Sequence, residues 1–263
     1  MPELPELRIM SKFINHCSKD KKFTKAFHVK KGNIPQEFDN LCNFRINSKS
    51  IGKELILNLD SLSIYVFMGM SGNWTYVSTD EWSRTKFVRL RIDDETGNSL
   101  LLYGGYMGPK YSVQYPFKGT KRGPDPVDDF DNFKYNILKN LKNKDFDKPI
   151  YEVLLNQKYF NGIGNYLRST IIYYADINPF ISGREAINQN ESIIDMCRDV
   201  ALTAYNFNGG QIKDWKNPFD GDSDEFDKWV FYQKGSSIKD SNNRTFWFDS
   251  KWKIESGLRE RTN

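Results

Sequence analysis

Midway along this chain of 263 residues the spacing of apolar residues changes from that of strands to that of helices, and this change restricts the possible folds more than any other feature. Residues 55–59 and 87–92 carry an apolar side chain at every second position, which is the period of half-buried strands. A polar turn over 93–99 leads into a further apolar run at 100–103. Beyond residue 126 the spacing becomes three or four, as on one face of a helix. The pattern predicts an α+β protein.

Glycine and proline mark where the first half of the chain ends. Gly119, Gly123, Pro124 and Pro126 interrupt both kinds of periodicity, as expected of a linker or domain boundary. A chain of this length supports two medium-sized cores. We therefore predict an N-terminal antiparallel β-sandwich domain over 1–120, a helical domain over 121–228, and a hairpin with a tail over 229–263.

The helices and the terminal hairpin follow from the same spacing. A first helix starts just after Pro5, and further helices are predicted over 130–141, 149–159, 166–175 and 191–205. Asn178-Pro179 stops the helix over 166–175, and Gly209-Gly210 ends the helix over 191–205. Strands at 229–232 and 245–248 are predicted to flank a long exposed loop centred on 240–243.

The composition indicates an intracellular compartment and is compatible with a polyanionic partner. The net charge of +4 allows a polyanionic partner but is low for a purely electrostatic binder of nucleic acid. Cys17, Cys42 and Cys197 are far apart, so neither a disulfide framework nor a clustered zinc site is indicated. No run approaches 18 apolar residues, and charged residues interrupt the N-terminus where a signal peptide would be apolar. We expect a soluble intracellular protein with no membrane partner.

The first six residues, MPELPE, carry reactive groups in close succession. If Met1 is removed, Pro2 becomes an N-terminal secondary amine next to Glu3 and near Glu6. An α-amino group titrates near pH 8 and a lysine near pH 10.4, so at neutral pH more of the α-amine is a free base able to attack a sugar carbon. The alternative is an ordinary Pro/Glu-rich start of an exposed helix.

Several motifs occur in the order found in one enzyme family. They are the N-terminal PELPE, Gly52-Lys53-Glu54-Leu55, Gly69-Met70-Ser71-Gly72, and Asn161-Gly162-Ile163-Gly164-Asn165. The chain thereby resembles the Fpg/Nei family of DNA glycosylases over nearly its whole length. The segments 122–126, 146–150, 235–238 and 244–248 are most similar to the endonuclease VIII-like branch. Each motif alone is weak, but their order makes a chance match improbable.

The resemblance implies a fold and a set of catalytic residues. In the family, flanking helices accompany the N-terminal β-sandwich, and the helical domain carries a helix-two-turn-helix and a zinc finger or a zincless copy of it. The resemblance makes Pro2 the nucleophile at C1′ of an everted damaged nucleotide and Glu3 the group that protonates the sugar oxygen. It makes Glu6 a helper that positions the sugar or a water, and Lys53 a phosphate or proton-transfer residue instead of a solvated strand lysine.

Four further residues match DNA-contacting positions. Met70 would fill the gap left by the everted base, the alternative being a core methionine. Asn165 would contact backbone phosphate at a helix start, where it could also be an N-cap. Arg244, and to a lesser degree Lys234, would grip phosphate, the alternative being ordinary surface cations.

Two departures from the family pattern shape the expectations. Residues 229–250 contain no cysteine, so we expect a zincless finger held by aromatic packing, with no metal and no cofactor; its aromatic residues are Trp229, Phe231, Phe246, Trp247 and Phe248. Many relatives place Arg-Arg-Phe where this chain has 106–111, with Met107, Lys110 or Tyr111 as substitutes. We therefore expect weak discrimination of the opposite base. Thr85 also stands where relatives often have a histidine.

The resemblance implies a bifunctional DNA glycosylase and AP lyase in base-excision repair. Its expected substrates are oxidised pyrimidines, hydantoins and formamidopyrimidines, with β,δ-elimination through a Schiff base to Pro2. The expected partner is damaged double-stranded DNA, with single-stranded or bubble DNA as further candidates, bound by a monomer in the nucleus or another DNA-containing compartment. The alternative function is a non-catalytic binder of damaged or distorted DNA, which would not require the Pro2, Glu3, Glu6 and Lys53 set.

Overall fold

The computed structural model describes residues 2–29, 38, 41–105, 107–113, 122–209, 219 and 223–253. The chain divides into two compact units, here called the sandwich unit (1–120 and 207–223) and the helical unit (121–206 and 224–263). The division after residue 120 coincides with the first predicted boundary. The hairpin predicted from residue 229 is grouped with the helical unit, and 207–223 with the sandwich unit. Gly119 and Gly210, two of the predicted breaks, lie outside the described residues.

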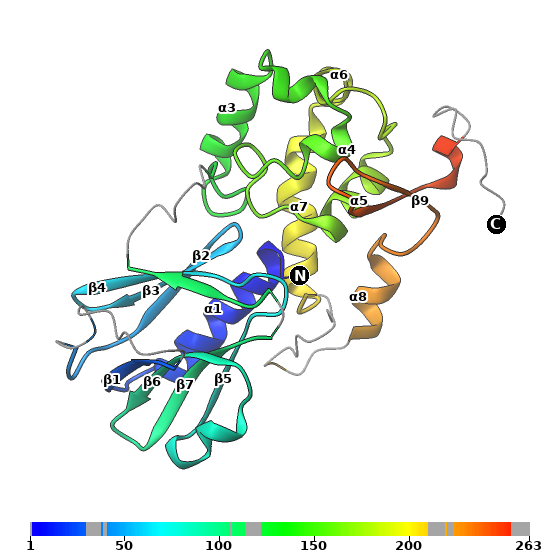
Figure 1. The fold of residues 1–263 in the computed structure, drawn as a ribbon. Coiled ribbons are helices and arrows are strands. Elements are labelled where there is room, and N and C mark those ends of the chain that lie inside the picture. Colours follow the sequence, from blue (N-terminus) through cyan, green and yellow to red (C-terminus); the bar gives the residue numbers. More distant parts are fainter. Residues whose placement is uncertain are drawn as a thin grey trace. The chain divides into compact units, whose positions relative to one another are not determined.

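The described part of the sandwich unit contains two four-stranded antiparallel sheets (Figure 1). One has the order β1 (Phe23–His28), β6 (Val88–Asp94), β7 (Asn98–Tyr103) and β5 (Asn73–Ser78); the other has the order β2 (Asn47–Ile51), β3 (Glu54–Leu59), β4 (Leu62–Phe67) and β8 (Lys110–Ser112). A 3-10 helix, η1 (Thr79–Arg84), links β5 to β6. The predicted strands at 55–59, 87–92 and 100–103 are all present because leucine and isoleucine side chains from these strands form the buried core.

Helix α1 (Leu4–Ser18) packs along β2 and also contacts β3 and β5. Its apolar face, formed by Leu7, Met10, Ile14 and Cys17, is buried. Near its C-terminal end the Asn15 side chain exchanges two hydrogen bonds with the Ser48 backbone, at 2.8 and 2.7 Å. These bonds tie the C-terminal end of α1 to the start of β2.

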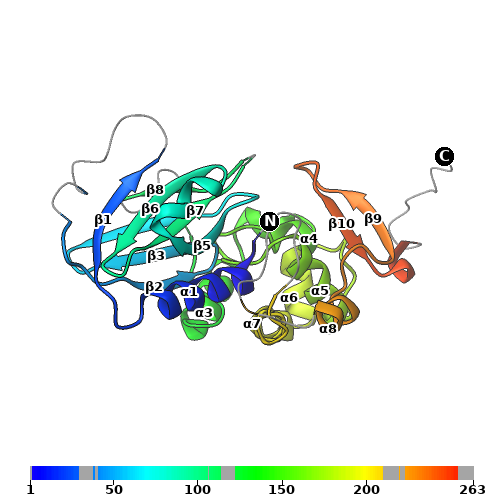
Figure 2. The ribbon, with the colours of Figure 1, turned by 90° about the horizontal axis from the view of Figure 1, so that it is seen from below.

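The helical unit is built around two buried helices, α5 (Asn165–Ala175) and α7 (Ser192–Asn206), which pack on each other. Around them lie α3 (Phe130–Asn140), η2 (Lys144–Asp147), α4 (Ile150–Val153), α6 (Gly183–Gln189) and α8 (Ser223–Trp229). The hairpin of β9 (Ser236–Lys239) and β10 (Thr245–Phe248) contacts α5 and leads into η3 (Ser250–Lys253), as Figure 2 shows. Among the described residues no helix combines the length and apolar character needed to cross a membrane.

The predicted helix over 149–159 is wrong in its second half. Helix α4 ends at Val153, and two turns follow before α5 begins. The Gln157 side chain explains this, since it donates to the Ile163 carbonyl at 2.8 Å and accepts the Gly162 N–H at 3.0 Å. Side-chain bonds of this kind compete with helix hydrogen bonds. The result is the predicted helix-two-turn-helix.

The predicted strand over 229–232 is also wrong. Trp229 ends α8, and the ring of Phe231 stacks on Tyr173 with their centroids 4.2 Å apart. The first hairpin strand is β9, and the connection to β10 is exposed as predicted but is a short turn instead of a long loop. Asp240 closes this turn because its buried carboxylate accepts the N–H groups of Asn242 and Arg244, both at 2.9 Å.

Candidate active site

The candidate nucleophile and its two carboxylates lie at the start of α1. Glu3 is the N-cap, in extended conformation, and its N–H donates to Oε2 of Glu6 at 2.8 Å. The two residues form a capping box, so each side chain is oriented by the other's backbone. Pro2 is buried, and Glu3 and Glu6 are only 2% and 0% exposed. Three of the four predicted catalytic residues therefore lie at or directly before the first turn of α1.

Gly209 covers the carboxyl group of Glu6 within the sandwich unit. A Cβ atom at this position would lie 2.7 Å from Oε1 of Glu6 and 3.1 Å from Cδ1 of Ile9. Gly209 also has a φ of +70°, which L side chains rarely adopt. The chain can pass this close to Glu6 only as glycine. The sequence indicated Gly209 as a helix terminator, and nothing in its local pattern indicated the contact with Glu6.

Lys53 and Met70 come from two turns of the same unit. Lys53 is half-buried directly after Gly52, which has a φ of +55°, in the turn between β2 and β3. Met70 lies in the β4–β5 loop and is 42% exposed, so it is not a core residue. The Met70 N–H donates to the Met107 carbonyl at 2.9 Å, which joins this loop to the β7–β8 loop.

The motif at 122–126 holds the two turns between α4 and α5 in place. The Gly123 N–H donates to the Gln157 carbonyl, and the Gly123 carbonyl accepts from the Asn161 side chain, both at 2.9 Å. A Cβ atom on Gly123 would lie 2.4 Å from the Lys158 carbonyl oxygen. Only glycine allows this approach, so the motif presents the two-turn segment in one conformation.

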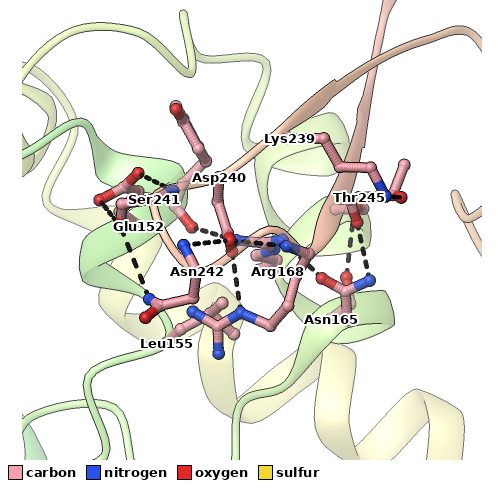
Figure 3. A network of polar contacts seen from close by, with 12 residues as sticks. Glu152, Leu155, Asn165, Arg168, Lys239, Asp240, Ser241, Asn242 and Thr245 are labelled. Carbon is pink, nitrogen blue, oxygen red and sulfur yellow. Dashed lines mark hydrogen bonds and ion pairs between the residues drawn. The ribbon is translucent and has the colours of Figure 1, made fainter.

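Asn165 joins α5 to the hairpin (Figure 3). The N-cap of α5 is Gly164, so the N-cap alternative for Asn165 is wrong. Its side chain donates to the Thr245 carbonyl at 2.8 Å and accepts from Nη2 of Arg168 at 2.5 Å. These bonds hold the amide at the first helical position, where the backbone N–H groups of an α-helix lack intrahelical acceptors.

A buried ion pair lies at the centre of the same network (Figure 3). Arg168 is fully buried, and its Nη1 donates to Oδ2 of Asp240 at 2.9 Å and to the Tyr151 carbonyl at 3.1 Å. Burial alone would raise the pKa of Asp240, but the N–H groups of Arg244 and Asn242 and the Arg168 guanidinium outweigh it and lower that pKa below its usual value. Sequence reasoning missed this pair; the available signal was an arginine inside an otherwise apolar helix.

The two predicted phosphate-binding cations have different surroundings. Arg244 is exposed, and its Nε donates to the same Oδ2 of Asp240 at 2.9 Å, so the buried ion pair also orients this guanidinium. The Lys234 ammonium donates to the carbonyls of Asp227, Lys228 and Val230 at 2.8, 3.1 and 2.7 Å. Lys234 thus caps the C-terminal end of α8, and its phosphate contact stays a prediction.

Comparisons with known proteins agree with this arrangement. A family model described as the formamidopyrimidine-DNA glycosylase N-terminal domain matches residues 1–104. Human Endonuclease 8-like 1 is 29% identical over 94% of this chain and 72% of its own length. Formamidopyrimidine-DNA glycosylase of Ureaplasma parvum is 28% identical over 82% of each chain. The chain is similar to Fpg/Nei DNA glycosylases over most of its length, which confirms the predicted resemblance and the predicted enzyme class.

Solved structures of the Fpg/Nei family confirm the predicted fold class. Fpg of Lactococcus lactis, in a complex with DNA that contains an abasic site, has a TM-score of 0.79 at 18% identity and matches 95% of this chain and 98% of its own. Fpg of Thermus thermophilus has a TM-score of 0.77 at 16% identity, with the same coverage. At these identities the likeness concerns the fold alone.

The hairpin is supported by aromatic packing, as expected for a zincless Fpg/Nei finger. Phe246 and Phe248 are buried, and Phe246 stacks on Tyr151 with ring centroids 4.7 Å apart. Phe180 meets Phe248 edge to face at 5.1 Å. No group of three or more His, Cys, Asp or Glu side chains able to hold a metal ion occurs in the described part of the chain.

The three residues proposed to replace the family's Arg-Arg-Phe have different surroundings. The Tyr111 hydroxyl contacts Nδ1 of His28, its ring stacks on Phe38, and burial raises its pKa. Lys110 is exposed on β8. Met107 is 59% exposed and adjoins the Met70 loop. Of the three, Met107 is placed best to act with Met70; Tyr106 lies outside the described residues.

Proposed function

We propose that this chain excises oxidised bases from DNA and then cleaves the strand through a Schiff base between Pro2 and the sugar. The observation that carries this proposal is the position of Pro2 beside two buried carboxylates, which the capping box holds at the start of α1. A capping box accounts for both carboxylates but does not require the close approach of Gly209 to Glu6. The reaction requires prior removal of Met1, which leaves Pro2 with a free secondary amine.

The proposed reaction assigns one step to each group. The lone pair of the Pro2 nitrogen attacks C1′, and the C1′–N bond to the damaged base breaks, so that its electrons leave with the base. The departing base takes up the proton that the Pro2 nitrogen loses. The C1′–O4′ bond then breaks, O4′ takes a proton from Glu3, and a C1′=N iminium forms. Loss of a C2′ proton expels the 3′ phosphate, a second elimination breaks C5′–O, and hydrolysis of the imine restores the amine. Glu6 positions the sugar or a water, and Lys53 assists at the phosphate.

The proposed substrate is a damaged nucleotide everted from duplex DNA. Met70 fills the space left in the base stack, while Asn165, Arg244 and Lys234 contact backbone phosphates. Oxidised pyrimidines, hydantoins and formamidopyrimidines are the proposed lesions, and single-stranded or bubble DNA the proposed additional substrates. We propose that the protein acts as a monomer in a compartment that contains DNA.

Borohydride trapping tests this function directly. The wild-type chain is incubated with DNA that contains thymine glycol or a preformed abasic site, and borohydride reduces any imine to a stable covalent complex. We expect trapping with both substrates, and none with a variant that retains one extra residue before Pro2. Glu3→Gln should reduce trapping on thymine glycol much more than on the abasic site. Binding without trapping or strand cleavage would support the non-catalytic DNA binder instead.

A further inference from the structure

Three large apolar side chains of the sandwich unit are exposed without belonging to its core. They are Met70, Phe87 and Met107, which are 42%, 65% and 59% exposed. Each lies on a different connection: Met70 between β4 and β5, Phe87 between η1 and β6, and Met107 between β7 and β8. Exposed apolar groups that gather on one surface of a protein commonly mark a binding site.

Backbone contacts join the three connections. Besides the bond from Met70 to Met107, the Gly104 N–H donates to the Phe87 carbonyl at 3.2 Å. A Cβ atom on Gly69 would lie 2.2 Å from the Met107 carbonyl oxygen. A Cβ atom on Gly105 would lie 3.7 Å from the Phe87 ring. Glycine at 69 is thus required where the Met70 and Met107 connections meet, while Gly105 lies in ordinary contact with the Phe87 ring. We call Met70, Phe87 and Met107 the apolar tip.

The backbone at the tip is strained at two positions. Phe87 has a φ of +59° and Met107 a φ of +45°, a region that costs free energy for any residue with a Cβ atom and is rare for a bulky one. Burial does not offset this cost, because both side chains are mostly exposed. The Arg89 guanidinium donates to the Gly104 and Gly105 carbonyls at 3.3 and 3.5 Å and so holds the adjoining loop. Strain retained at an exposed aromatic residue points to a ligand.

We propose that Phe87 and Met107 extend Met70 into an apolar wedge, with the Phe87 ring stacked on a base next to the everted nucleotide. This inference rests on the proposed function. Every base has an aromatic face, and eversion of one nucleotide leaves its neighbours without a stacking partner. Lys86 and Lys110, both exposed, flank the tip in sequence and supply cations for the phosphates.

The wedge has a consequence for specificity. None of its three side chains offers the hydrogen-bond donors that an arginine would direct at a base edge. The wedge itself therefore contacts the base opposite the lesion by shape and stacking alone. The rate of base excision should accordingly vary little among the four opposite bases.

The test combines Phe87→Gly with a control at Tyr135, an aromatic side chain of similar exposure on α3. Glycine accepts the positive φ without strain, so Phe87→Gly should melt at or above the wild-type temperature. It should lower abasic-site cleavage in duplex DNA about tenfold or more, the value of one base–aromatic stack, and change cleavage of the same strand alone much less. A 2-aminopurine next to the abasic site, which fluoresces when unstacked, should respond to wild type and to Tyr135→Ala but only weakly to Phe87→Gly.

The possible outcomes distinguish the wedge from other roles of Phe87. A lower melting temperature together with equal losses on duplex and single-stranded DNA would make Phe87 a structural residue and overturn the wedge. Wild-type cleavage and fluorescence in Phe87→Gly would overturn it as well. Failure of the wild type to form any trapped complex would refute the proposed function, while the 2-aminopurine signal, which needs no catalysis, would still decide the wedge.

Discussion

The buried ion pair between Arg168 and Asp240 should carry much of the stability of the hairpin. Arg168→Met keeps most of the side-chain volume but removes the buried charged partner of the Asp240 carboxylate, which leaves only the exposed Arg244, and it leaves the Tyr151 carbonyl without its donor. Removing one partner of a buried pair destabilises a protein by about 3–5 kcal/mol. We expect a loss of this size in the free energy of unfolding of the helical unit, and accelerated hydrogen exchange at the amides of β9 and β10.

Arg244 provides the matched control, because it donates to the same Oδ2 atom of Asp240 at the same 2.9 Å. Its side chain is 44% exposed, so solvent weakens the interaction, and Arg244→Ala should cost less than about 1 kcal/mol. The double variant Arg168→Met, Asp240→Leu should regain part of the loss, since it leaves no buried charge. Chemical denaturation measures all three. Equal effects of Arg168→Met and Arg244→Ala would refute the reasoning.

Three further predictions concern the finger, the site and the metal. Because the pKa of Asp240 is lowered on folding, its stabilising contribution is complete above the ordinary value of 3.8 and is lost as the pH falls below it; hydrogen exchange along an acid titration should show the hairpin opening first. Gly209→Ala should displace Glu6 and lower base excision at least about tenfold, whereas Gly97→Ala, at a φ of +80° with open space around it, should leave excision unchanged; single-turnover rates compare the two. Chelators should leave strand cleavage unchanged, and inhibition reversed by added zinc would contradict the zincless finger.

Local periodicity predicted most of the fold because strands and helices with one buried face show it directly in sequence. The predictions failed where distant groups decide the local conformation. Gln157 ends the run after α4 by bonding to backbone groups of the following turn. The predicted strand over 229–232 is absent because Trp229 completes a helix and Phe231 packs on α5. Apolar composition alone did not distinguish these roles.

The candidate site shows the same limit. Pro2, Glu3 and Glu6 are contiguous, so their chemistry could be predicted from the sequence. The cover that Gly209 provides for Glu6 depends on residues at opposite ends of the sandwich unit's sequence, which no spacing reveals. Likewise the link from Asn165 through Arg168 to Asp240 joins a helix to a hairpin far along the chain. The exposed position and strained backbone of Phe87 appear only in the structure.

Mapping the borohydride-reduced complex by mass spectrometry tests the central claim most directly. The reduced adduct is digested, and the peptide that carries the sugar remnant is sequenced to the modified atom. The account predicts the remnant on the nitrogen of Pro2, in a chain that has lost Met1. A remnant on the Nζ atom of Lys53 or of any other lysine would contradict it.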